Sequence, residues 1–122
     1  MDRVPSRHVL VVEDDEAISD LLGDILDQDY TVLRATGAEA ALDIMGRQRV
    51  DVVLLDYRLP DGSGQEVATQ ADKSGIPMIW ITGDPAAVQV LDHDPHLVLP
   101  KPFGLLGIKG VLARMLGDSP QP

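Results

Sequence analysis

The sequence has no cysteine, which excludes disulfide bonds, thiolate metal ligands and cysteine nucleophiles. It also lacks any apolar run near the ~18 residues that a membrane-spanning helix needs. Its first apolar run, Val9 to Val12, stops after four residues, which is too short for the core of a secretory signal peptide. Together these absences favour a cytoplasmic protein that does not insert into membranes.

Basic residues are scarce. Ten Lys and Arg stand against twenty Asp and Glu, which gives a net charge of −10. Nucleic-acid binding needs clustered Lys and Arg for phosphate contacts, so we expect no direct nucleic-acid partner. The 122 residues correspond to one domain, and 44% of them are hydrophobic, which is typical of a folded chain. We expect a domain over 8–117, a short leader over 1–7 and a flexible tail over 118–122.

Short apolar runs alternate with stretches that carry the helical period of apolar residues. The predicted strands are 8–13, 30–35, 50–56, 76–82 and 96–100. The predicted helices are 15–28, 37–47, 64–73, 84–92 and 103–117. This alternation predicts an α/β fold in which helices cover both faces of a doubly wound parallel sheet. Ligands of such sheets bind beyond the carboxyl ends of the strands.

Charged and polar residues stand where the predicted strands end. They are Glu13, Asp14, Asp15, Asp56, Thr82 and Lys101. Carboxylates that are brought together repel one another unless a cation is present. Oxygen donors without Cys or paired His favour Mg²⁺, with Mn²⁺ as a substitute. A carboxylate beside Mg²⁺ can attack a phosphoryl group, which makes Asp56 a candidate nucleophile, with Lys101 and Thr82 as contacts of the phosphoryl oxygens.

Four segments resemble the motifs of the receiver domain of two-component response regulators. They are VLVVEDDE, VVLLDYRLPDGSG, WITGD and PKPF, each at a predicted strand end, and the resemblance covers 8–117. It implies a flavodoxin-like (βα)5 fold with strand order 2-1-3-4-5. It also implies that a sensor histidine kinase or a phosphotransfer protein donates a phosphoryl group to the aspartate of the third strand.

The resemblance assigns the metal ligands. Asp56 is the phosphoacceptor and a ligand, Asp14 binds Mg²⁺ directly, and Glu13 acts through a water molecule. The backbone carbonyl of Arg58 supplies a further ligand. The three consecutive acids leave a choice of pair, but the motif places the pair directly after the strand. Asp15 then begins the first helix, where an acid is favoured by capping and by the helix dipole.

The resemblance also assigns the switch residues, and here the sequence departs from the pattern. Thr82 supplies the switch hydroxyl, and Lys101 contacts the phosphoryl group. The resemblance also implies that the peptide bond between Lys101 and Pro102 is cis. The family usually has Tyr or Phe three residues before this lysine, whereas this chain has Val98. The intervals between the motifs are short, which predicts trimmed third and fourth helices. We also expect Arg58 to pair with Asp84 across the pocket mouth and to alter dephosphorylation.

The sequence thus predicts a signalling module that catalyses only its own phosphorylation and dephosphorylation. Because the chain ends soon after the last helix, we expect a stand-alone receiver that contacts an unknown downstream protein through its fourth helix, fifth strand and fifth helix. Alternatives are a phosphate sink, a receiver excised from a hybrid kinase, and a degenerate scaffold. A Mg²⁺-dependent aspartyl-phosphate phosphatase is a further alternative, but the first strand lacks its D-x-D pattern. Trp80 is predicted in the core, and the histidines at the surface or in loops.

Overall fold

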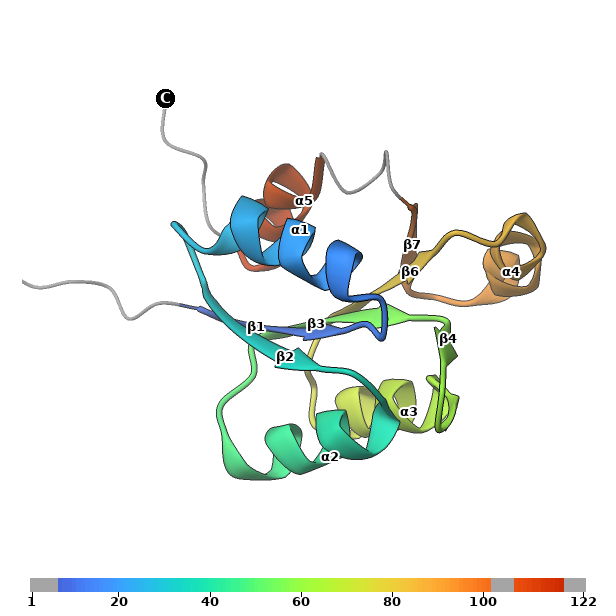
Figure 1. Cartoon of the computed structure of the whole chain (residues 1–122), viewed down its shortest axis with the longest axis horizontal. Helices are drawn as coiled ribbons and strands as arrows, with labels where there is room; N and C mark the ends of the chain where they lie inside the picture. Colours follow the sequence, from blue (N-terminus) through green and yellow to red (C-terminus); the bar gives the residue numbers. More distant parts are fainter. Residues whose placement is uncertain (1–6, 102–106, 118–122) are drawn as a thin grey trace, which may run out of the picture.

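A five-stranded parallel sheet forms the centre of the computed structural model, which describes residues 7–101 and 107–117 (Figure 1). The strands are β1 (His8–Val12), β2 (Thr31–Ala35), β3 (Val52–Asp56), β6 (Met78–Thr82) and β7 (Leu97–Pro100). Their order across the sheet is β2-β1-β3-β6-β7. Counted by these five strands alone, this is the order 2-1-3-4-5, so the predicted fold is confirmed.

Helices cover both faces of the sheet. They are α1 (Glu16–Leu26), α2 (Ala38–Arg47), α3 (Gln65–Lys73), α4 (Pro85–Val90) and α5 (Ile108–Met115). Figure 1 shows α1 and α5 on one face, α2 and α3 on the other, and α4 beside the β6–β7 edge. No helix in the described part of the chain has the length and apolar character needed to cross a membrane.

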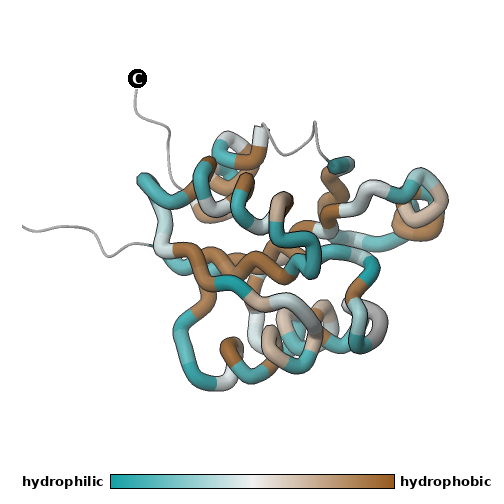
Figure 2. Tube along the Cα trace, in the orientation of Figure 1, coloured by the Kyte–Doolittle hydropathy of each residue, from teal (hydrophilic) through white to brown (hydrophobic). Residues whose placement is uncertain are grey.

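The core has two layers because successive side chains of a strand point to opposite faces. In β3, Val53 and Leu55 pack on the side of α2 and α3, whereas Val52 and Leu54 pack on the side of α1 and α5. All four are fully buried. Figure 2 shows the resulting hydrophobic centre between more polar helices. Trp80 is 1% exposed, so its predicted place in the core is confirmed.

Two predicted helix starts are confirmed by their caps. The side chain of Asp15 accepts a hydrogen bond from the backbone N–H of Ile18 at 3.2 Å, and so caps α1. Asp84 accepts from the N–H of Ala86 at 2.9 Å, and Pro85 occupies the first position of α4. These caps satisfy backbone donors that a helix start leaves without an intrahelical partner.

The structure corrects the predictions at several element ends. The segment after β3, predicted as a loop, contains a small antiparallel hairpin of β4 (Arg58–Leu59) and β5 (Gly62–Ser63). Helix α4 ends at Val90, earlier than predicted, and a 3-10 turn, η1 (Leu91–His93), follows it. Helix α5 covers Ile108–Met115, and its predicted start at 103 lies outside the described residues. The predicted cis bond to Pro102, and most of the predicted leader and tail, lie outside the described residues.

Candidate functional site

The sheet topology brings the acids of the first and third strands together. Strands β1 and β3 pair directly, with Val12 beside Leu55, so the next residues along the chain, Glu13 and Asp56, lie at one edge. The backbone N–H of Glu13 donates to the carbonyl of Ala35 at 3.0 Å, which continues the β1–β2 ladder and fixes the acid's position. Adjacent strands that both end in acids therefore create a carboxylate pair at this edge.

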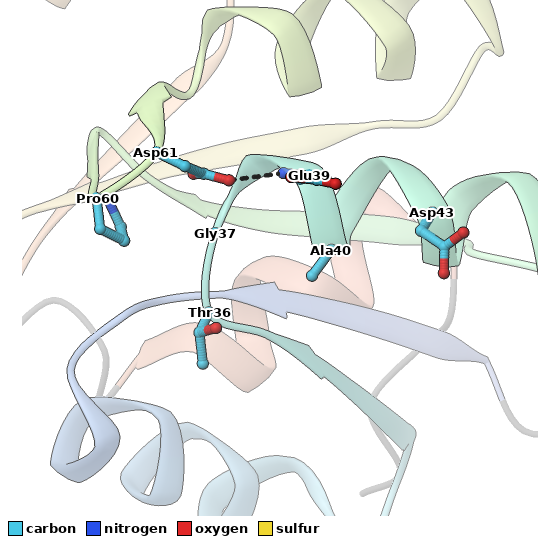
Figure 3. Close-up of a pocket in the computed structure, with 7 residues that line it drawn as sticks. All are labelled: Thr36, Gly37, Glu39, Ala40, Asp43, Pro60 and Asp61. Atoms are coloured by element: carbon cyan, nitrogen blue, oxygen red, sulfur yellow. Dashed lines mark hydrogen bonds between the residues drawn. The ribbon is translucent and has the colours of Figure 1, made fainter.

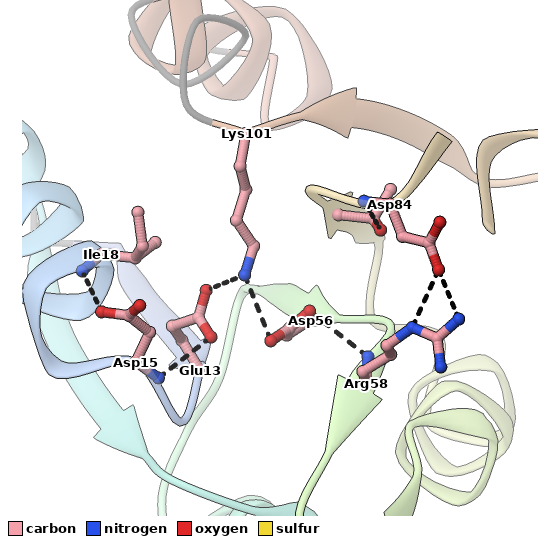
Figure 4. Close-up of polar contacts among 8 residues, drawn as sticks. Glu13, Asp15, Ile18, Asp56, Arg58, Asp84 and Lys101 are labelled. Carbon is pink, nitrogen blue, oxygen red and sulfur yellow. Dashed lines mark hydrogen bonds and ion pairs between the residues drawn. The ribbon is translucent and has the colours of Figure 1, made fainter. Parts of the chain in front are cut away.

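Lys101 lies between these two carboxylates (Figure 4). Its Nζ is 2.5 Å from Oε1 of Glu13 and 3.2 Å from Oδ2 of Asp56. The backbone N–H of Lys101 donates to the carbonyl of Thr82 at 2.8 Å, which anchors the lysine to the end of the neighbouring strand. The side chain of Glu13 is fully buried, and that of Asp56 is 7% exposed. One cation is thus shared by two acids in a nearly dry setting.

One lysine cannot neutralise two carboxylates, and the pKa values of Glu13 and Lys101 reflect this excess of negative charge. Burial and the contact with Asp56 together raise the pKa of Glu13 to about 7, although the contact with Lys101 acts to lower it. Burial alone would lower the pKa of Lys101, but the hydrogen bond to Glu13 and the charge of Asp56 raise it. The lysine therefore stays charged, while the pKa of Glu13 lies near neutral pH.

The exposed Asp14 completes a candidate metal site. One carboxylate oxygen from each of Glu13, Asp14 and Asp56 can be chosen so that all lie within 4.8 Å of one another. This is an all-oxygen donor set with an excess of negative charge, and Mg²⁺ prefers such ligands and keeps part of its water shell. The residues therefore fit the predicted ion. Asp15 points elsewhere: its carboxylate caps α1, while its N–H donates to Oε2 of Glu13 at 3.2 Å.

Thr82 and Arg58 border the site from the β6 and β4 sides. Thr82 is 2% exposed, and its hydroxyl accepts a hydrogen bond from the N–H of Asp84 at 3.0 Å. The N–H of Arg58 donates to Oδ1 of Asp56 at 3.3 Å. Nε of Arg58 donates to Oδ2 of Asp84 at 3.0 Å, and its Nη2 also contacts this oxygen (Figure 4). The predicted Arg58–Asp84 pair is therefore present.

Two polar contacts were not predicted. Asp61, which lies in the turn of the hairpin after β3, accepts hydrogen bonds from the first N–H groups of α2. His96, the first residue of the predicted fifth strand, lies just before β7, and its half-buried side chain sits between Asp94 and Asp72. The sequence could have indicated only the turn at Asp61, because Asp61 and the start of α2, like His96 and Asp72, are more than 20 residues apart in the chain. Val98 packs beside Trp80, its partner in the β6–β7 register.

Known proteins resemble this chain in sequence and in fold. A family model for the response regulator receiver domain matches residues 9–112. Response regulator MprA of Mycolicibacterium vanbaalenii is 36% identical over 113 residues, which cover 88% of this chain and 48% of that protein. Regulatory protein VanR of Enterococcus faecium is 33% identical over 118 residues, which cover 89% and 51%. The chain thus spans about half the length of both relatives.

The solved structures agree with this match. The solution structure of the receiver domain of the PhyR response regulator from Erythrobacter litoralis superimposes with a TM-score of 0.80, at 26% identity and with 96% of each chain covered. The family match covers most of the chain, and it includes β1, β3, β6 and β7, whose ends carry the acids, the threonine and the lysine. The chain therefore belongs to the family of response regulator receiver domains, which are signalling modules.

Proposed function

We propose that the chain receives a phosphoryl group on Asp56 from a phosphohistidine of a sensor kinase or phosphotransfer protein, in a Mg²⁺-dependent reaction in the cytoplasm. The observation that carries this proposal is the buried Asp56 carboxylate, which lies 3.2 Å from the Nζ of Lys101 and within the acidic group formed with Glu13 and Asp14. A structural acid at a strand end needs neither a buried lysine nor two further acids.

The transfer forms one bond and breaks another. An oxygen of Asp56 attacks the phosphorus atom, the bond from phosphorus to the donor nitrogen breaks, and its electron pair stays on the histidine ring. Lys101 remains protonated and moves its charge from Asp56 toward the phosphoryl oxygens. The hydroxyl of Thr82 turns to donate to one of these oxygens. Positioning and charge neutralisation supply most of the catalysis in this type of reaction.

The metal would be held by residues at the same edge. We assign Asp14 and Asp56 as direct ligands, Glu13 as a ligand through water, and the Arg58 carbonyl as a further donor. When bound, Mg²⁺ neutralises charge on the phosphoryl oxygens. The support for this assignment is the all-oxygen donor set and the short span of its three carboxylates.

The direct test is phosphorylation by acetyl phosphate. The wild type with Mg²⁺ should gain the mass of one phosphoryl group, and Asp56→Asn should gain none. Asp43→Asn, which removes an exposed acid of α2, serves as the control and should react like the wild type. Phosphorylation of Asp56→Asn, or an unmodified wild type at saturating Mg²⁺, would refute the proposed function.

We further propose that the Arg58–Asp84 pair slows hydrolysis of the phosphorylated form. The pair joins β4 to the start of α4, and Arg58 also contacts Asp56 through its N–H, so we place the pair on the path of an attacking water. Arg58→Ala and Asp84→Asn should each speed the loss of phosphate several-fold. Asparagine keeps the capacity to cap α4, so this variant tests the charge pair alone. Unchanged hydrolysis rates in both variants would remove this role.

The output is proposed to be a contact with a downstream protein at α4 and β7. Val88, Val90 and Leu97 are the large hydrophobic residues exposed within the described part of the chain, and all three lie on these two elements. Exposed apolar residues gathered in one region are typical of protein interfaces. Val90→Asp should leave phosphorylation unchanged and should abolish binding of a partner that recognises the phosphorylated wild type.

A further inference from the structure

Helix α2 begins without a cap of its own. Its N-cap residue is Gly37, which has no side chain to accept a hydrogen bond. Asp61, from the hairpin after β3, fills this role (Figure 3). Its Oδ1 accepts from the N–H of Ala38 at 2.8 Å and its Oδ2 accepts from the N–H of Glu39 at 3.0 Å. One carboxylate thus satisfies two backbone donors of a helix far away in the sequence.

The contact depends on both partners. A Cβ at Gly37 would lie 2.7 Å from Oδ1 of Asp61, closer than real Cβ atoms come, so glycine at this position permits the approach. The hydrogen bonds from Glu39 and Ala38 lower the pKa of Asp61, which keeps it an acceptor at neutral pH. A hollow of about 520 Å³ lies beside the contact, lined by Thr36, Gly37, Glu39, Ala40, Asp43, Pro60 and Asp61 (Figure 3).

The segment that carries Asp61 also carries the edge of the candidate metal site. Strand β4 follows Asp56 after a single residue, and Arg58, its first residue, donates to the Asp56 carboxylate. In the hairpin, Leu59 pairs with Gly62, which puts Asp61 in the connecting turn. Leu59 is 9% exposed and packs into the core. The backbone at Arg58 is therefore held between a buried side chain and the turn that Asp61 attaches to α2.

We propose that Asp61 is a positioning residue for the metal site. Its attachment to α2 fixes the hairpin and with it the main chain of Arg58, so Mg²⁺ affinity depends on a carboxylate that lies outside the ligand group. This inference rests on the proposed function, because it takes the Arg58 carbonyl as a ligand. Outer partners that orient a ligand commonly change metal affinity by about 10-fold or more when they are removed.

Backbone amide shifts in an NMR titration with Mg²⁺ would measure this dependence. Asp61→Ala should raise the Kd about 10-fold. Asp61→Asn keeps one acceptor oxygen but places an NH2 group beside the second backbone donor, so its Kd should lie between those of the wild type and Asp61→Ala. Asp43→Ala is the matched control, because it also removes one carboxylate close to α2, and the carboxylate of Asp43 pairs with Arg47 of the same helix. An Asp61→Ala variant that binds like the wild type, or a Kd raised equally by Asp43→Ala, would overturn the inference.

A second measurement needs no variant and decides the matter even if Asp61→Ala fails to fold. If the metal site and the Asp61 contact stabilise each other, linkage requires that Mg²⁺ also stabilise the contact. Hydrogen exchange at the amides of Ala38 and Glu39 should therefore slow on adding Mg²⁺ to the wild type. Unchanged exchange there, with Mg²⁺ demonstrably bound, overturns the inference alone. Absence of Mg²⁺ binding to the wild type would instead refute the proposed function.

Discussion

Two clusters, each with one basic side chain between two carboxylates, lie at opposite edges of the sheet. At the carboxyl edge, Lys101 lies 2.5 Å from Glu13 and 3.2 Å from Asp56. The side chains of these three residues are 15%, 0% and 7% exposed. Each comes directly from a strand or from the residue that follows one, so the sheet itself holds the cluster in place.

At the amino edge, His96 precedes β7 and occupies the position of the cation. Its Nδ1 lies 2.5 Å from Asp94 and its Nε2 lies 2.8 Å from Asp72. Asp72 belongs to α3 and its side chain is 59% exposed. Burial alone would lower the pKa of His96, yet the hydrogen bonds to Asp72 and Asp94 raise it. Burial would raise the pKa of Asp94, yet the hydrogen bonds from His96 lower it.

The difference between the clusters separates a structural ion pair from a site prepared for chemistry. At the amino edge, the raised pKa of His96 and the lowered pKa of Asp94 both favour the charged forms, so the charges of the cluster stabilise one another. At the carboxyl edge, the pKa of Glu13 is raised, which favours its neutral form, because burial and a second acid outweigh the single lysine. Unresolved competition of this kind is characteristic of functional sites.

Removing the cation should separate the clusters most. Lys101→Met leaves two buried acids without a counter-charge, and we expect a loss of about 3 kcal/mol in the free energy of unfolding. Urea unfolding without Mg²⁺ measures this. Lys109→Met is the control, because Lys109 pairs with Asp29 at an exposed position, and its loss should be below about 0.5 kcal/mol. Equal losses in the two variants would show that burial of the Lys101 pair is energetically irrelevant.

Mg²⁺ should stabilise the fold through the carboxyl edge only. At a free concentration about 100 times the Kd, binding adds about 2.7 kcal/mol to the free energy of unfolding. Asp14→Asn should lose most of this gain, whereas Asp94→Asn should keep it. Thermal unfolding with and without Mg²⁺ provides the measurement. A gain that depends on Asp94 rather than Asp14 would mean that the ion binds at the wrong edge for the proposed chemistry.

Neutralising the phosphoacceptor should stabilise the protein without metal. Asp56→Asn removes one of the two acids that compete for Lys101, and we expect a gain of about 1 kcal/mol because active sites commonly sacrifice stability for function. Chemical denaturation at neutral pH, with EDTA present, would measure it. A loss of stability instead would indicate that the ion pair between Lys101 and Asp56 outweighs the repulsion between the acids.

The smallest expected effect is a pH dependence at the amino edge. The folded pKa of His96 is raised above its ordinary value of 6.5. Its stabilising contribution is therefore complete below that ordinary value and is lost as the pH rises through the folded pKa. His96→Gln should cost about 1 kcal/mol at about pH 6 and less at about pH 9. A cost that grows between these two pH values would contradict the assignment.

The sequence predicts the fold and the strand-end residues because both depend on local patterns. The run Val52 to Leu55 has consecutive apolar residues, which is typical of a strand that is buried on both faces of a sheet. The acid that follows the run therefore lies at the carboxyl edge of that sheet. The strand order, which the family resemblance implies, then brings Glu13 and Asp56 together through the pairing of β1 with β3. The roles assigned to these residues remain predictions, since neither phosphorylation nor metal binding follows from their positions alone.

The contacts that the sequence does not predict join side chains across long separations. Asp61 belongs to a segment with turn chemistry, and its use as a cap for α2 depends on how closely the hairpin approaches Gly37. His96 has no metal-ligand spacing, and its partner Asp72 comes from another element. The strands of the hairpin are only two residues long, too short to show an alternating pattern. Tertiary geometry decides all three features.

The strand order has a consequence for the growing polypeptide. The strands that bear the two acids pair directly, but Lys101 follows β7, which pairs with β6. During synthesis from the amino terminus, the β1–β3 pair can therefore assemble before its internal counter-ion has left the ribosome. Until the last strand docks, the repulsion between the two acids must be offset by a dissolved cation or by protonation of one of them.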